Sequence, residues 1–303
     1  MPFRRRMTPG GSLKAARTDQ IAVPRLRRGD LMPCFLRRVS RILIGTCTHK
    51  LWEAAMPTRR KTSRTAGPAA GGGQGAQASV EAAYLFGFRV AVATTVLTVL
   101  TFALALTALP DKVPYPFTDD VIAAQWPGDY YWLFPAMMLM LLFVALVAAL
   151  HQYSPDRSKT YSSLALCLAV IAAAVLLVNY YIQAVVMPTS LEKGQLDGWS
   201  IFTQYNPNGI FIALEELGYL LMTVVFLCLV PVLSTRTRLE RSIRWLFLAS
   251  FAAAVASLAV VVALRGMNRE DVFEIIIISI VWLTLIAGGV LLAVLFKRGP
   301  QSV

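Results

Sequence analysis

Six long apolar stretches constrain the fold more than any other feature of the sequence. A bilayer core is about 30 Å thick, so a helix needs about 20 predominantly apolar residues to cross it. The stretches that meet this requirement are Ala83–Leu109, Tyr130–Leu150, Leu164–Met187, Ile210–Leu233, Trp245–Leu264 and Val272–Phe296. They lack the alternation of strands, and helices satisfy their own backbone hydrogen bonds in lipid. The sequence therefore predicts an all-α, polytopic membrane protein, a bundle of six transmembrane helices, with the third helix closed by Pro188.

The composition excludes an ordinary soluble enzyme and divides the chain in two. Hydrophobic residues make up 56% of the chain and charged residues only 15%, whereas soluble domains carry about a quarter charged residues. The net charge of +12 comes from residues 1–79, which hold 16 Lys/Arg and 3 Asp/Glu, against 13 and 14 in residues 80–303. The predicted domains are therefore a basic, largely disordered N-terminal tail, 1–79, and a six-helix transmembrane domain, 80–303.

The tail leaves two questions open. The segment that begins at Met56, MPTRRKTSRT, has the form of a basic cytoplasmic lead into a first membrane helix. Residues 1–55 are therefore either part of the protein or an upstream extension from a misassigned start codon. Nucleic-acid binding is not favoured, because the tail offers positive charge without a folded platform of stacking aromatic residues.

The distribution of basic residues predicts that both termini are cytoplasmic. Short cytoplasmic loops carry an excess of Lys and Arg. With the N-terminus inside, the inner segments beyond the tail hold 8 Lys/Arg and the outer loops hold 4. The predicted location is the inner (plasma) membrane, as a multi-pass protein. The two longer outer loops, 110–129 and 188–209, carry aromatic residues and are expected to lie on the outer membrane surface or to pack over the helix ends.

Polar side chains gather in the outer half of three predicted helices. Glu215 and Glu216 lie about 8 Å inside the fourth span at 1.5 Å per residue, and Tyr219 follows one turn later, where its hydroxyl could reach either carboxyl group. Asn179 and Gln183 share a face near the outer end of the third span, and Glu274 lies near the outer start of the sixth. Ionisable residues inside a membrane are costly and mark function by default. The candidate polar site is Glu215, Glu216, Asn179, Gln183, Tyr219 and Glu274.

Two functional interpretations remain open at this point. One is an outward-facing polar pocket that binds or transports a cation, a proton or a small polar solute. The other is a structural hydrogen-bond network in a non-catalytic membrane scaffold, sensor or partner subunit. For the second, the fifth span offers small residues for helix packing or for a homo-oligomer or partner contact, with Ala249, Ala253 and Ala256 on one side and Ser250 and Ala254 on a neighbouring one.

Known catalytic and cofactor motifs are not recognised in the sequence. It contains no HExxH, GxSxG, phosphate-binding loop or dinucleotide fingerprint. Its four cysteines show no paired ligand spacing, and its two histidines do not suggest a metal or haem site. We therefore expect no enzymatic activity, no cofactor and no metal, with the lipid bilayer as the principal partner.

The second half of the chain resembles a family of uncharacterised bacterial six-helix integral membrane proteins. The resemblance is carried by NYYIQAVV from Asn179, by FTQYNPNGIFIALEELGYLLM, by RLERSIRWLF and by the span Phe273–Phe296. It covers residues 80–178 more loosely and does not include the tail before Met56. It implies a six-helix membrane protein and supplies no functional residues, because the family has no assigned activity.

Overall fold

The computed structural model describes residues 72–107, 128–195, 197–266 and 271–299. The predictions for residues 1–71, including the alternative start at Met56, and for residues 110–127 of the first outer loop lie outside these ranges. The described residues form helices and connecting turns without strands. Six of these helical segments are long and apolar enough to cross a membrane, which confirms the predicted all-α membrane fold.

The six long helices coincide with the six predicted spans. Two short helices, α7 (Met187–Glu192) and α8 (Trp199–Phe202), lie between the third and fourth of them. The long helices are α3 (Gly72–Thr107), α5 (Leu133–Tyr153), α6 (Lys159–Tyr181), α9 (Ile210–Leu229), α10 (Arg238–Arg265) and α11 (Val272–Lys297).

Several helices begin before the predicted apolar stretch, α3 as early as Gly72, and two of the differences at helix ends have identifiable reasons. α10 begins seven residues before the apolar stretch, because Thr237 and Glu240 form a capping box: the Thr237 hydroxyl accepts from the Glu240 backbone N–H at 3.2 Å and donates to its carboxylate at 2.7 Å. Pro188 does not close the third span. The turn Ile182–Val186 is π-helical, and the helix continues through Pro188 into α7. Proline has no backbone N–H to donate, and a π-helical turn before it allows the helix to continue without that hydrogen bond.

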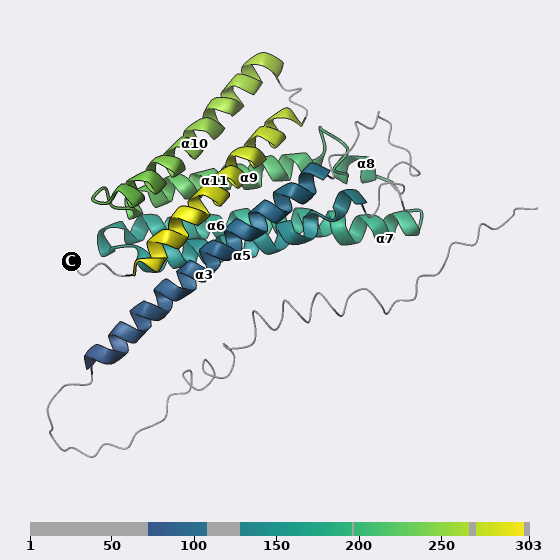
Figure 1. Cartoon of the computed structure of the whole chain (residues 1–303). Helices are drawn as coiled ribbons and strands as arrows, with labels where there is room; N and C mark the ends of the chain where they lie inside the picture. Colours follow the sequence, from purple (N-terminus) through teal and green to yellow (C-terminus); the bar gives the residue numbers. More distant parts are fainter. Residues whose placement is uncertain (1–71, 108–127, 196, 267–270, 300–303) are drawn as a thin grey trace, which may run out of the picture. The chain divides into compact units, whose positions relative to one another are not determined.

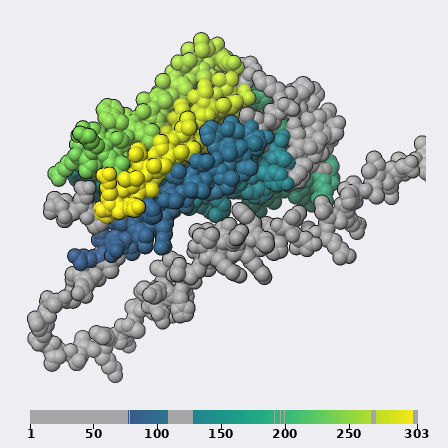
Figure 2. Space-filling model, in the orientation of Figure 1, coloured from purple at the N-terminus to yellow at the C-terminus, as the bar shows by residue number. Residues whose placement is uncertain are grey.

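Five of the long helices form a closed ring. α3 packs against α5, α5 against α6, α6 against α9 and α9 against α11, which returns to α3. α10 packs outside this ring, against α9 and α11. Figure 1 shows the helices of this arrangement, and in Figure 2 α10 (green), α11 (yellow) and α3 (blue) lie side by side on one face.

The ring has two distinct ends. Tyr84 near the start of α3, Tyr153 at the end of α5 and Phe296 at the end of α11 contact one another edge to face, each pair of ring centroids 6.2 Å apart. We call this the basic end, because α6 begins there with Lys159, α10 begins there with Arg238 and α11 ends there with Lys297. The far end holds the end of α6 and the starts of α9 and α11. The described chain therefore enters and leaves the bundle on the same side.

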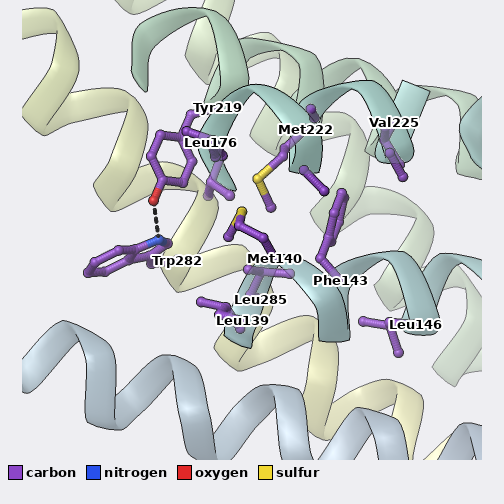
Figure 3. Packing of buried hydrophobic residues seen from close by; sticks show 14 of the residues in the cluster. Leu139, Met140, Phe143, Leu146, Leu176, Tyr219, Met222, Val225, Trp282 and Leu285 are labelled. Atoms are coloured by element: carbon purple, nitrogen blue, oxygen red, sulfur yellow. Dashed lines mark hydrogen bonds between the residues drawn. The ribbon is translucent and has the colours of Figure 1, made fainter. Parts of the chain in front are cut away.

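Apolar side chains from the ring fill its interior. Leu139, Met140 and Phe143 of α5 meet Leu176 of α6, Met222 and Val225 of α9 and Leu285 of α11 (Figure 3). All of these are at most 2% exposed. Because lipid is as apolar as these side chains, close van der Waals packing rather than transfer from water holds such helices together in a bilayer.

Glycines allow the closest helix contacts. A Cβ atom on Gly289 of α11 would collide with the Thr95 hydroxyl of α3 and lie 3.2 Å from the Ala91 carbonyl oxygen. The Thr95 hydroxyl is itself held at 2.9 Å from that carbonyl. On α9, a Cβ on Gly218 would lie 2.5 Å from Leu176 Cγ. Both positions provide close packing inside the bundle.

The small residues of α10 divide between two surfaces. Ser250 and Ala254 are 4% and 0% exposed and face the bundle. Ala249, Ala253 and Ala256 are exposed. The sequence predicted two sides of this helix for packing, and the described bundle uses only the side with Ser250 and Ala254.

Substitution of Gly289 by alanine should destabilise the bundle selectively. The added methyl group forces Thr95 away from the Ala91 carbonyl or separates α3 from α11, a type of overpacking that costs about 1–3 kcal/mol. Gly288→Ala is the matched control, because its nearest new contact is an ordinary 3.4 Å from Phe247 Cε1. Thermal unfolding in detergent micelles measures the difference, and equal midpoints for the two variants would contradict this packing.

Candidate functional site

Two adjacent glutamates lie inside the bundle near the start of α9. The helix begins at Ile210 after the extended Gly209. Glu215 is 0% exposed and Glu216 is 8% exposed. Removing a carboxylate from water costs several kcal/mol unless hydrogen bonds or opposite charges compensate. The partners of these side chains therefore decide what the site can do.

The carboxyl groups of Glu215 and Glu274 are close enough to act on each other. Glu274 lies in the first turn of α11 and is 8% exposed. The pair joins α9 to α11, two neighbouring helices of the ring. Glu216 also acts electrostatically on Glu274, as does Asp271 at the start of α11. The centre of the site is therefore a carboxyl pair with further acidic groups close by.

A chain of aromatic hydrogen-bonding groups ends on Glu215. The Tyr180 hydroxyl of α6 donates to Glu215 Oε1 at 2.7 Å and lies 2.7 Å from the Tyr219 hydroxyl. The Trp282 indole N–H of α11 donates to the Tyr219 oxygen at 3.1 Å, the bond drawn in Figure 3. Tyr180, Tyr219 and Trp282 are all at most 1% exposed. This chain links three helices around one carboxyl group.

Aromatic rings enclose the chain on the side of α3 and α5. The centroid of Trp132 lies 5.4 Å from that of Tyr180 and 6.3 Å from that of Trp282. Phe102 of α3 meets Trp282 edge to face at 5.4 Å. These apolar rings give the site a low local dielectric constant. Electrostatic interactions within it are therefore stronger than at a protein surface.

Asn179 and Gln183 hold backbone groups rather than the carboxyl pair. The Asn179 amide donates to the Phe211 carbonyl oxygen of α9 at 3.0 Å, and the Gln183 amide donates to the Phe202 carbonyl oxygen of α8. Gln183 lies in the π-helical turn and is 1% exposed. Asn179 thus joins the end of α6 to the first turn of α9, and Gln183 joins it to the segment that leads into α9.

That segment is also tied to α5 at the far end. The Tyr205 hydroxyl donates to Asp129 Oδ2 at 3.0 Å, and the Gln204 amide lies 3.5 Å from the Asp129 carbonyl oxygen. Burial raises the pKa of the Tyr205 phenol well above its ordinary value, so it remains a neutral donor at all physiological pH values. Gln204 and Tyr205 therefore hold this segment to Asp129, four residues before the start of α5.

The structure brings together only part of the predicted site. Glu215, Glu274 and Tyr219 belong to one connected group, with Glu216 acting on it electrostatically. The sequence suggested that the Tyr219 hydroxyl could reach Glu215 or Glu216. In the structure it bonds to Tyr180 and Trp282 instead.

Tyr180 and Trp282 are the two members of the site that the sequence interpretation missed. Trp282 follows Glu274 by eight residues, which places both on one face of α11. Tyr180 is adjacent to Asn179, but nothing in the sequence shows that it faces α9.

The arrangement is suited to holding a proton between oxygen atoms. Within the described ranges, no group of three or more His, Cys, Asp or Glu side chains is arranged to hold a metal ion. Helices contribute the acidic pair, its tyrosine donor and Phe102, and Trp132 directly precedes α5, so the site has a rigid support.

Comparisons with known protein families, curated proteins and solved structures give no match to the chain. The resemblance described for its second half therefore stays a prediction from sequence.

Removal of the Tyr180 hydroxyl should destabilise the folded protein more than removal of the neighbouring Tyr181 hydroxyl. In Tyr180→Phe, Glu215 Oε1 and the Tyr219 hydroxyl both lose a buried partner, and each such loss costs about 1–3 kcal/mol. Tyr181→Phe is the matched control, because Tyr181 is 55% exposed and should change stability by no more than about 0.5 kcal/mol. Thermal unfolding in micelles compares them; a Tyr180→Phe protein as stable as the control would show that the hydroxyl chain contributes nothing.

Proposed function

We propose that this multi-pass membrane protein binds a cation at the Glu215–Glu274 pair and carries it across the membrane. The observation that carries the proposal is the contact between two buried carboxyl groups from different helices. A structural bond between α9 and α11 could be made by neutral side chains at lower cost, since each buried ionisable group costs several kcal/mol. A cation provides the compensating charge that the pair requires.

The predicted orientation places the site toward the outside of the cell. The basic end carries the excess of Lys and Arg, 8 against 4, that is typical of a cytoplasmic face. The far end, with Glu215 and Glu274, then lies in the outer half of the membrane. The resemblance to bacterial integral membrane proteins favours the plasma membrane as its location. The proposal includes no catalytic reaction.

A scaffold or partner subunit is the second candidate, supported by a different helix. α10 packs outside the ring and leaves Ala249, Ala253 and Ala256 exposed. Small residues allow the backbone of another membrane helix to approach closely. In this alternative a second copy or another membrane protein covers α10, and the carboxyl pair serves only to connect α9 with α11.

Flux in proteoliposomes tests the first candidate. Purified protein is reconstituted, a potassium diffusion potential is imposed, and inward movement of protons is followed with a trapped pH-sensitive dye and that of sodium with a radioactive isotope. The wild type should carry one of these cations, and Glu215→Gln and Glu274→Gln should fall to the level of empty liposomes. Glu192→Gln, which changes an exposed glutamate of α7, should keep the full flux.

Two results would contradict cation transport. Flux that persists in a correctly folded Glu215→Gln protein of lowered thermal stability would show that the pair is structural. No flux of either cation in the wild type, together with a membrane protein that reproducibly co-purifies, would favour the scaffold.

A further inference from the structure

We propose that the cation held at this site is a single proton, which resides on Glu274 and is donated to Glu215. The proposal rests on the Glu215–Glu274 site proposed above and assigns a different role to each of its two carboxyl groups. Glu215 is the fixed carboxylate acceptor. Glu274 is the group that takes up and releases the proton, and Tyr180, Tyr219 and Trp282 are positioning residues.

The contact between the two carboxyl groups requires a proton. An ionised carboxylate is an acceptor only, so two of them cannot form a hydrogen bond with each other. Two carboxylates in contact also repel strongly, and such pairs share one proton. We therefore assign one carboxylic acid and one carboxylate to the close pair of Glu215 and Glu274.

The direction of the aromatic chain identifies Glu215 as the carboxylate. An indole N–H can only donate, so the Tyr219 oxygen accepts from Trp282. The Tyr219 hydroxyl then has its own proton available for Tyr180, 2.7 Å away. Tyr180 in turn donates to Glu215 Oε1 at 2.7 Å. Every donor in the chain points toward Glu215, an arrangement that stabilises negative charge on its carboxyl group.

The second oxygen of Glu215 completes the assignment. Glu215 Oε2 is buried and accepts no hydrogen bond from an N–H or hydroxyl group of the described residues. A buried acceptor without a donor is costly. A protonated Glu274 provides the missing donor, since its carboxyl group is the one in contact with Glu215.

The charges around Glu274 oppose a second negative charge at that position. Among the described residues, the charged groups that act on Glu274 are Glu215 and Glu216 of α9 and Asp271 of α11, all of them acidic. On the other helices that pack against α11, Arg89 of α3 and Arg265 of α10 are exposed. On α3, Gly87 lies against Phe296 and Phe102 lies against Trp282. Arg89 is therefore level with the C-terminal end of α11, whereas Glu274 lies in its first turn.

Position along the helices makes Glu274 the exchanging member. Glu274 is the third residue of α11, at the far end of the ring, and is 8% exposed, whereas Glu215 is 0% exposed. A proton that arrives from water at the far end therefore reaches Glu274 first. Its release leaves two carboxylates in contact, which favours separation of α9 from α11 or immediate reprotonation.

Infrared spectroscopy of the reconstituted full-length protein at about pH 7 tests the assignment, because an exposed glutamate with a pKa of about 4.3 is fully ionised there. The wild type should show the C=O stretch of a buried carboxylic acid. Glu274→Gln should abolish this band. Glu215→Gln should keep it at a shifted frequency, because Glu274 then donates to a neutral amide instead of a carboxylate. Glu192→Gln, as the control, should leave it unchanged.

Several results would overturn the proposal. A wild-type spectrum without this band would show that no proton is held. Loss of the band in Glu215→Gln or Glu216→Gln, with retention in Glu274→Gln, would place the proton on another residue. A band that disappears when sodium chloride replaces choline chloride would show that the pair holds a metal cation; this would refute the proton and leave cation transport standing. Conversely, the expected bands without any flux in proteoliposomes would support the proton site and refute transport.

Discussion

The contact between the carboxyl groups of Glu215 and Glu274 is the interaction on which the centre of this structure depends. It joins α9 and α11 where both helices are buried, and it imposes strict requirements on its surroundings. A charge at this depth must receive hydrogen bonds, and Tyr180 supplies one from α6. The Tyr180 hydroxyl is in turn hydrogen-bonded to the Tyr219 hydroxyl, which accepts from the Trp282 N–H. Glu215, Glu274, Tyr180, Tyr219 and Trp282 thus form one connected system.

The apolar packing of the ring supports this system. Gly289 allows α11 to approach α3, and Gly218 allows α9 to approach α6 against Leu176. Both contacts hold helices that carry members of the polar chain. Because side chains in a packed interior have few alternative positions, these approaches restrict the relative movement of the helices that carry the polar chain. α10 packs outside the ring against α9 and α11 and supplies no member of the polar chain described here.

The architecture was predictable from sequence because crossing a membrane requires a length of apolar residues that can be counted directly. Glu215 and Glu274 were also identifiable, since charges within such stretches are rare. Their pairing was not predictable, because it depends on which helices are neighbours in the ring. The same limitation hid the role of Tyr180, and it left Asn179 and Gln183 assigned to the site although their amides hold the Phe211 and Phe202 carbonyl groups. Sequence spacing relates residues on one helix and gives little information about the opposing one.

The measurement that tests this account most directly is an experimental structure of the protein in a lipid nanodisc, at a resolution that shows side chains. The account predicts that the Glu215 and Glu274 carboxyl groups lie in direct contact, with oxygen atoms about 2.5–2.7 Å apart as in O–H···O⁻ hydrogen bonds, and that Tyr180 bonds to Glu215. A basic side chain or a water-filled cavity between the two carboxyl groups would contradict it.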